Sequence, residues 1–210
     1  MVHLPKHPID LGILGETYAI TRRDDCQHLT TWLAAQYTLD EVETAVFERL
    51  YETKKNLINY YNEEELKIEL ISLVFFLANV DITSKVKVFY ERPLKAIVGN
   101  YQLSVIADCL VATPTSFNRP KNPYFFLQEF KKGKGDDKDP EAQMLAAMLI
   151  AQQQNNNQQP LYGSFVIGAH WHFTTLVEKQ YCLSRSFDAT NYKDLKQIVF
   201  ILRKIKDFAL

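Results

Sequence analysis

The chain has 210 residues, a length typical of a single domain. Apolar residues make up 47% of it and charged residues 23%, which excludes a wholly disordered, collagen-like or disulfide-scaffold protein. The 24 basic and 25 acidic side chains give a net charge of -1, so the chain is not a polycation made for non-specific nucleic-acid binding. Any contact with nucleic acid must come from local patches.

The cysteines and the apolar runs bear on the cellular location. Cys26, Cys109 and Cys182 lie far apart and form no C-x-x-C pair, which argues against a zinc ribbon or a disulfide framework and favours a reducing compartment. The longest apolar run, 70–80, is shorter than the about 20 residues that span a bilayer. The N-terminus lacks the apolar region of a signal peptide. We therefore expect a cytoplasmic protein without a membrane segment.

The N-terminal segment, 1–60, is expected to be helical after about twenty residues without a clear pattern. Apolar residues recur at helical spacing from Cys26, and a second helix follows a capping-box pattern that begins at Thr38. Asn62 with Glu65 three residues later predicts the start of a third helix.

Strands are expected after this helix. Polar and apolar residues alternate over 85–90, and the β-type runs 94–98 and 103–111 flank a turn at Gly99, which predicts a hairpin. The aromatic run 124–130 predicts a further strand.

The remainder of the chain is expected to contain two helices and at least two strands. A cap at Asp139 followed by Pro140 predicts a helix start. The later expected elements are strands at 162–171 and 173–177, a third strand at 181–186, and an amphipathic helix at 194–208. The chain is thus predicted to be one α/β domain, 1–210, in which a core of residues 61–210 follows the helical segment.

The triplet Glu129-Phe130-Lys131 is the most informative motif. Side chains two apart on a strand share a face, so Glu129 and Lys131 project together, while Phe130 points the other way. Asp108 is a lone acid within the apolar run 103–111, where an acidic residue is disfavoured. If the two strands are neighbours, Asp108 and Glu129 converge on one hard cation such as Mg²⁺.

An acid followed about twenty residues later by E-x-K resembles the central motif of the PD-(D/E)XK nuclease superfamily. The order of the expected elements over 62–175 also resembles its restriction-endonuclease-like αβββαβ core, a mixed sheet flanked by helices. One departure is Ala107, where many members have proline before the acid.

The resemblance implies a role for each residue of the motif. Asp108 and Glu129 would hold Mg²⁺, or Mn²⁺, together with the main-chain carbonyl of Phe130, and Lys131 would orient the attacking water or neutralise developing charge. Gln143, on the helix after the triplet, would position water or phosphate.

The resemblance also implies an acid on the first core helix. Glu64, Glu65 and Glu69 are all available for this role, and Glu65 is named provisionally, although the capping box can use it instead.

The implied function is Mg²⁺-dependent hydrolysis of nucleic-acid phosphodiester bonds, with DNA as the expected substrate and a homodimer as a plausible assembly. Residues 118–138 and 193–207 each carry a net charge of +3 and offer phosphate contacts. The alternative is a nuclease-like fold kept as a binding or assembly module without catalysis. His170 and His172 share a strand face but lack a third ligand nearby in the sequence, so we assign them no metal.

Overall fold

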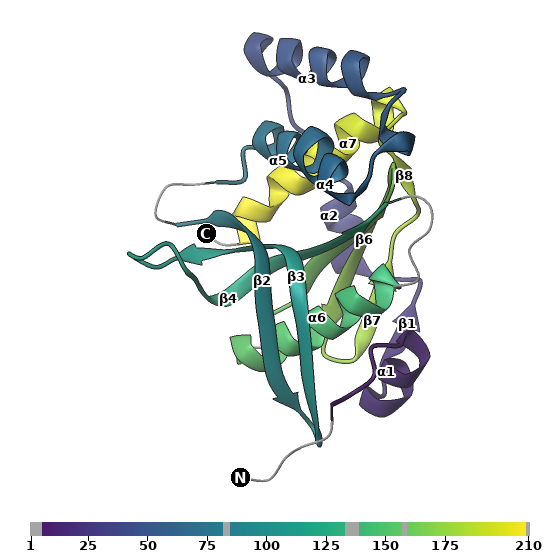
Figure 1. The fold of residues 1–210 in the computed structure, drawn as a ribbon, viewed down its shortest axis with the longest axis vertical. Coiled ribbons are helices and arrows are strands. Elements are labelled where there is room, and N and C mark those ends of the chain that lie inside the picture. The colour runs from purple at the N-terminus through teal and green to yellow at the C-terminus, as the bar shows by residue number, and fades with distance from the viewer. Residues whose placement is uncertain (1–5, 82–84, 133–138, 157–158, 209–210) are drawn as a thin grey trace.

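A computed structural model describes residues 6–81, 85–132, 139–156 and 159–208. Within these ranges, a mixed eight-stranded sheet is flanked by helices, as expected of an α/β protein (Figure 1). The sheet order is β1-β7-β6-β5-β4-β3-β2, and β8 pairs with β6 beside this path. Each helix in the described ranges is too short or too polar to traverse a bilayer.

The N-terminal segment is only partly helical. It contains α1 (Leu11–Tyr18), β1 (Thr21–Arg23), α2 (Gln27–Leu33), α3 (Glu41–Lys54) and the 3₁₀ turn η1 (Ile58–Tyr60). The strand β1 lies before the predicted helical pattern that begins at Cys26 and was not predicted, and it joins the far edge of the sheet parallel to β7. Its three residues are all exposed, so they carry no apolar alternation from which a strand could be predicted.

The predicted capping box of the second helix lies two residues further along the chain. The carboxylate of Asp40, and not the hydroxyl of Thr38, accepts the main-chain N–H of Glu43, and the Glu43 side chain accepts the N–H of Asp40. An aspartate followed by glutamate three residues later satisfies the same pattern, so the two registers compete in the sequence.

The third predicted helix is interrupted. It runs as α4 (Glu63–Leu66), a π-helical turn η2 (Lys67–Ile71) and α5 (Ser72–Ala78). The Asn62 side chain accepts the N–H of Glu65, and the Glu65 side chain accepts the N–H of Asn62, as the sequence predicts. A π turn within a helix is rare and is frequently found at functional sites.

Three long antiparallel strands follow. They are β2 (Lys87–Val98), β3 (Tyr101–Pro114) and β4 (Pro120–Lys131), with the predicted hairpin turn at Gly99. The two runs predicted around Pro93 belong to one strand. Proline is tolerated there because β2 is the edge of the sheet.

The crossover helix α6 (Pro140–Asn155) then leads to β5, which lies parallel to β4. The predicted strand 162–171 is in fact two strands, because the chain reverses at Gly168, whose φ is +58°. The remaining elements are β5 (Leu161–Ile167), β6 (His170–Val177), β7 (Gln180–Leu183), β8 (Phe187–Asp188), α7 (Tyr192–Arg203) and the 3₁₀ turn η3 (Lys204–Phe208).

Two apolar cores cover the two faces of the sheet. Helix α6 packs on one face together with Leu14 of α1, while α2, α5 and α7 pack on the other. Trp32 joins the N-terminal segment to this second core, because its Nε1–H donates to the carbonyl of Ile201 at 2.8 Å and its ring meets Phe126 edge-on. The segment before residue 61 is therefore part of the folded domain.

Cys26 and Cys182 form a disulfide across 156 residues, with their Cα atoms 6.3 Å apart. The cysteine spacing, which argued against a disulfide framework, did not indicate this pair, and Cys109 remains free and buried. Sequence spacing failed as a guide because β1 lies beside β7, with Arg23 opposite Cys182. The argument for a reducing compartment loses its basis.

Candidate active site

Asp108 lies where strands β3 and β4 stop pairing. Their register reaches the pair of Cys109 with Gln128. One residue further, the Asp108 Oδ2 accepts a hydrogen bond from the main-chain N–H of Phe130 at 2.8 Å. This side chain is 11% exposed. Its carboxylate is thus fixed beside the E-x-K triplet, as the sequence predicts.

The pairing of β2 with β3 is also interrupted at Asp108. The register of β2 with β3 passes over Asp108, and the opposing residue is Glu91. Glu91 has a φ of +52°, a left-handed conformation that costs a non-glycine residue about 1–3 kcal/mol. Strain of this kind clusters at functional sites.

Glu129 is a buried carboxylate whose charged neighbours among the described residues are Asp108 and Lys131. It has no solvent exposure, and neither of its carboxylate oxygens receives a hydrogen bond from a described residue. Burial first, and then the neighbouring Asp108 charge, raise the pKa of Glu129 well above its ordinary value. An ionised carboxylate in this position requires a cation, because burying an unpaired charge is strongly unfavourable.

Lys131 is held at the same place by three oxygen atoms. Its Nζ lies 3.0 Å from the main-chain oxygen of Phe130, 3.0 Å from Glu63 Oε1 and 3.9 Å from Asp108 Oδ2. Burial lowers the pKa of Lys131, but the Asp108 and Glu63 carboxylates outweigh this effect, so the pKa lies above its ordinary value. The ammonium group therefore stays charged beside the carboxylates.

Glu63 is the acid that the first core helix brings to this cluster. Glu65, the residue named from the sequence, turns back to cap the helix at Asn62 and has no described interaction with Asp108 or Glu129. Glu63 follows the cap directly, and this position is the one signal that could have identified it. Because the capping box uses Glu65, the other two first-turn acids, Glu63 and Glu64, are left to contact other elements.

The other two candidate acids of this helix serve elsewhere. Glu69 pairs with Lys54 of α3. Glu64 pairs with Lys67 at 3.1 Å, and the same Lys67 Nζ lies 2.7 Å from Glu91. Lys67, the first residue of the π turn, thereby links the helix to Glu91, the residue of β2 with the left-handed conformation.

Gln143 is the predicted residue that the described contacts do not bring into the cluster. It lies on α6 and is half-buried, and its Oε1 is buried without a hydrogen-bond partner among the described residues. Among the described residues, no hydrogen bond or ion pair links it to Asp108, Glu129 or Lys131. Its helix does pack against β4, the strand that carries the triplet.

The donors present fit a small hard cation rather than a soft one. In the described ranges, no set of three His, Cys, Asp or Glu side chains gathers in a metal-ligand arrangement. What Asp108, Glu129 and the Phe130 carbonyl offer is two carboxylates and one neutral oxygen. Mg²⁺ binds in this way because it retains several waters and takes only one or two carboxylates from the protein. A cation bound here would contact the Glu129 oxygens, which receive no hydrogen bond from the described residues.

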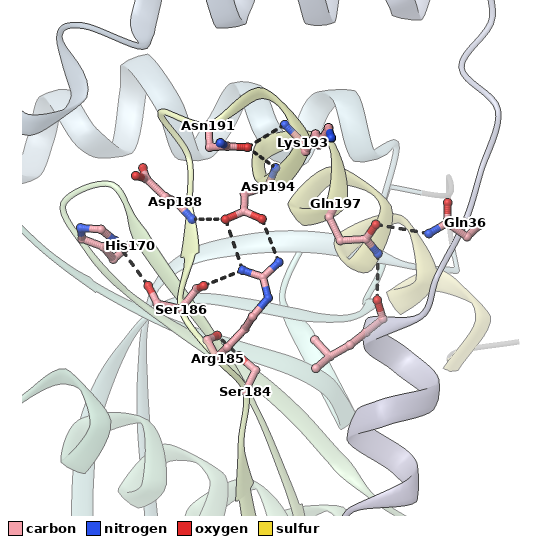
Figure 2. Close-up of polar contacts among 11 residues, drawn as sticks. Gln36, His170, Ser184, Arg185, Ser186, Asp188, Asn191, Lys193, Asp194 and Gln197 are labelled. Atoms are coloured by element: carbon pink, nitrogen blue, oxygen red, sulfur yellow. Dashed lines mark hydrogen bonds and ion pairs between the residues drawn. The ribbon is translucent and has the colours of Figure 1, made fainter.

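A second polar cluster lies between β6, β8 and the start of α7 (Figure 2). Arg185 binds both carboxylate oxygens of Asp194, at 2.8 and 3.2 Å, and the Ser186 hydroxyl lies 3.3 Å from His170 Nδ1. Asp194 also accepts the main-chain N–H of Asp188 at 3.0 Å. These bonds attach the N-terminus of α7 to the sheet, so the cluster has a structural role.

His170 and His172 of β6 belong to no group of three potential His, Cys, Asp or Glu ligands among the described residues. His172 is half-buried and stacks on Phe165 at 4.8 Å. Burial first, and then the neighbouring His170, lower the pKa of His172, which favours the neutral ring.

Comparisons with known proteins add no family to this picture. No protein-family model matches the chain, and no curated protein matches it significantly. The function is therefore inferred from the arrangement of Asp108, Glu129, Lys131 and Glu63.

Proposed function

We propose that the protein is a Mg²⁺-dependent nuclease that hydrolyses phosphodiester bonds of nucleic acid, with DNA as the substrate. The single observation that carries the proposal is the fully buried Glu129 carboxylate beside Asp108 and Lys131, whose oxygens receive no hydrogen bond from the described residues. A buried carboxylate of this kind destabilises a purely structural core, whereas a cation site requires one.

The fold class supports the proposal in a second way. The resemblance to the PD-(D/E)XK superfamily implies the element order αβββαβ, and this order is present as α5, β2, β3, β4, α6 and β5. The mixed sheet flanked by helices fits the restriction-endonuclease-like core that we propose. A homodimer and a cytoplasmic location are parts of the same proposal.

The residues of the cluster divide the chemical work. Asp108, Glu129 and the Phe130 carbonyl would hold Mg²⁺, with Mn²⁺ as a substitute, and the ion polarises the phosphate and lowers the pKa of water. Lys131 places a fixed positive charge where negative charge develops in the transition state. Glu63 holds the Lys131 ammonium group at 3.0 Å and so positions it.

The alternative is a nuclease-like module without catalysis. One contact favours it: the Lys131 ammonium group lies 3.0 Å from the Phe130 carbonyl, an oxygen that the metal site would use. In such a module, Glu129 would be protonated and would bind no ion.

The test is calorimetric titration of Mg²⁺ and of Mn²⁺ into the wild type, Asp108→Asn and Glu129→Gln, with cleavage of labelled single- and double-stranded DNA and RNA measured on the same preparations. Binding and cleavage that are both lost in the two variants support the proposal. Glu141→Gln is a matched control, since Glu141 is a partly buried carboxylate on α6 that lies outside the cluster. A wild type that neither binds the ions nor cleaves any of the substrates would identify the non-catalytic module.

A further inference from the structure

A groove of about 770 Å³ follows the free edge of the sheet, where β2 lies below α5 and α3 (Figure 1). Its volume falls within the range of ligand pockets. The groove is mainly apolar, with positive side chains at its rim. The residues that matter for the argument are Phe75 and Phe76 of α5, and Lys87, Val88, Phe89 and Arg92 of β2.

Two cations of the groove have no ion-pair partner among the described residues. The Nζ of Lys87 donates to Asn118 Oδ1 at 2.9 Å and lies 5.9 Å from the centre of the Phe89 ring. The Arg92 guanidinium lies 5.6 Å from the same ring, and its Nε is buried without a hydrogen bond. Both positive charges are thus available to an anionic ligand.

The two acids that line the groove are already engaged. Glu43 pairs with Arg203 at 2.7 Å. The Asp81 Oδ1 accepts the main-chain N–H of Val88 at 2.7 Å. The main-chain N–H does not neutralise Asp81, so Lys87 and Arg92 together leave the groove with a small net positive charge beside an apolar floor, a combination that attracts phosphate groups joined to flat apolar rings.

Two exposed aromatic rings lie on segments that line the groove. Phe76 is 75% exposed and Phe117 is 87% exposed. Phe117 directly precedes Asn118, the groove residue that binds Lys87. Exposed rings beside unpaired cations are the arrangement on which successive unpaired bases stack while their backbone phosphates meet positive charge.

The edge of β2 is poorly suited to pairing with a peptide strand. The Asp81 carboxylate occupies the outward N–H of Val88, Glu91 has a left-handed backbone conformation that interrupts regular strand geometry, and Pro93 has no N–H to donate. These features block strand addition in natural sheets. The side chains of the groove, and not the backbone edge, must therefore recognise the ligand.

The groove also leads toward the candidate active site. Tyr90 and Arg92 line it, and the residue between them is Glu91, which lies opposite Asp108. A strand lying in the groove would pass this end of β2.

We propose that the groove binds single-stranded nucleic acid and delivers it to the Asp108 cluster. This inference rests on the proposed nuclease function and names its substrate class as an unpaired strand. Phe76 and Phe117 stack on bases, and Lys87 and Arg92 contact phosphates.

The experiment measures binding of the full chain to fluorescein-labelled oligo(dT) by fluorescence anisotropy in EDTA, so that neither the metal nor cleavage contributes. Phe76→Ala is expected to weaken binding roughly fivefold or more, as loss of one stacked base does. Lys87→Ala is expected to weaken binding and to reduce the slope of log K against log salt by about 0.7. An unlabelled duplex is expected to compete poorly.

Two matched controls lie outside the groove. Tyr60→Ala removes another exposed ring, which is 82% exposed, and Lys95→Ala removes another exposed lysine of β2. Both are expected to bind as the wild type does. Wild-type affinity in the groove variants, equal losses in the controls, a preference for duplex, or no oligo(dT) binding by the wild type would each overturn the inference.

Cleavage assays with Mg²⁺ distinguish failure of the groove proposal from failure of the nuclease proposal. If the wild type cleaves duplex DNA but the groove variants bind and cleave normally, the nuclease proposal survives and the groove proposal fails. If Asp108→Asn retains oligo(dT) binding and the wild type never cleaves, the groove proposal survives and the nuclease proposal fails.

Discussion

Asp108 and Phe130 are joined across β3 and β4 by a side-chain hydrogen bond at the place where the backbone ladder ends. Phe130 fixes the Asp108 carboxylate through its N–H, and the carbonyl of the same residue contacts Lys131. One peptide segment of β4 thus orients the acid, the lysine and the neighbouring Glu129. Changes at any of these residues are expected to act through the others.

The roles of two neighbouring acids on α4 can be separated by substitution. Glu63→Ala removes the 3.0 Å partner of Lys131, so we expect cleavage to fall by roughly tenfold or more, as losses of supporting groups do. Glu65→Ala removes half of a capping box, so we expect a loss of about 1 kcal/mol in unfolding free energy and little change in cleavage. Cleavage rates and urea melts of both variants check this. Equal cleavage by the two would contradict the role given to Glu63.

The stability of the metal-free protein is expected to fall as the pH rises above 4.5, the ordinary pKa of Glu129. Burial raises the pKa in the folded state, so the folded chain keeps a proton that the unfolded chain releases, and deprotonation then favours unfolding. Glu129→Gln lacks this group and should show a flatter profile and higher stability in the alkaline range.

Urea unfolding in EDTA at several pH values measures this effect. Some slope should remain in Glu129→Gln, because burial also raises the pKa of Asp108. With Mg²⁺ present, the wild type should gain stability as the pH rises, since the ion binds the deprotonated pair. Identical pH profiles of the wild type and the variant in EDTA would contradict the account of Glu129.

The disulfide between Cys26 and Cys182 is expected to stabilise the fold. Its loop of 156 residues is long, and native disulfides typically contribute about 2–4 kcal/mol. Cys26→Ser with Cys182→Ser should lower the unfolding free energy by this amount, and a reductant should lower it in the wild type but not in the variant. Thiol titration of the native wild type should find the buried Cys109 unreactive, because burial raises its pKa. Three reactive thiols after unfolding without a reductant would refute the pairing.

Two arginine ion pairs should differ in their contribution to stability. Arg203 is buried, pairs with Glu43 at 2.7 Å and donates to the Leu77 carbonyl at 2.8 Å, so Arg203→Ala should cost about 3 kcal/mol. Arg185 is exposed, so loss of its pair with Asp194 should cost at most about 1 kcal/mol. Urea melts compare the two, and similar losses would contradict the distinction.

The sequence predicts the elements that its local patterns encode. The strand of the E-x-K triplet, the helix after Pro140 and the cap at Asn62 follow from alternation, from proline at a helix start and from a capping box. Because alternation places Glu129 and Lys131 on one face and Asp108 falls in a neighbouring strand, the centre of the candidate site could also be predicted.

What could not be predicted depends on contacts distant in the sequence. Nothing local to Thr21–Arg23 indicates pairing with β7, and nothing near Cys26 indicates Cys182. The choice of Glu63 over Glu65 turns on which first-turn glutamate reaches back to the cap, a matter of side-chain geometry within one helical turn. The groove at β2 requires α5 and the sheet edge to meet in space.

The parallel pairing of β1 with β7 has a consequence for synthesis on the ribosome. Residues 21–23 emerge early, but their partners, residues 180–182, are added near the end of the chain. Domains begin to fold during synthesis from the N-terminus. The first strand made is therefore among the last to be incorporated, and Cys26 must remain unpaired through most of translation. Release of the finished chain, rather than emergence of the N-terminal segment, sets the moment at which this edge of the sheet closes.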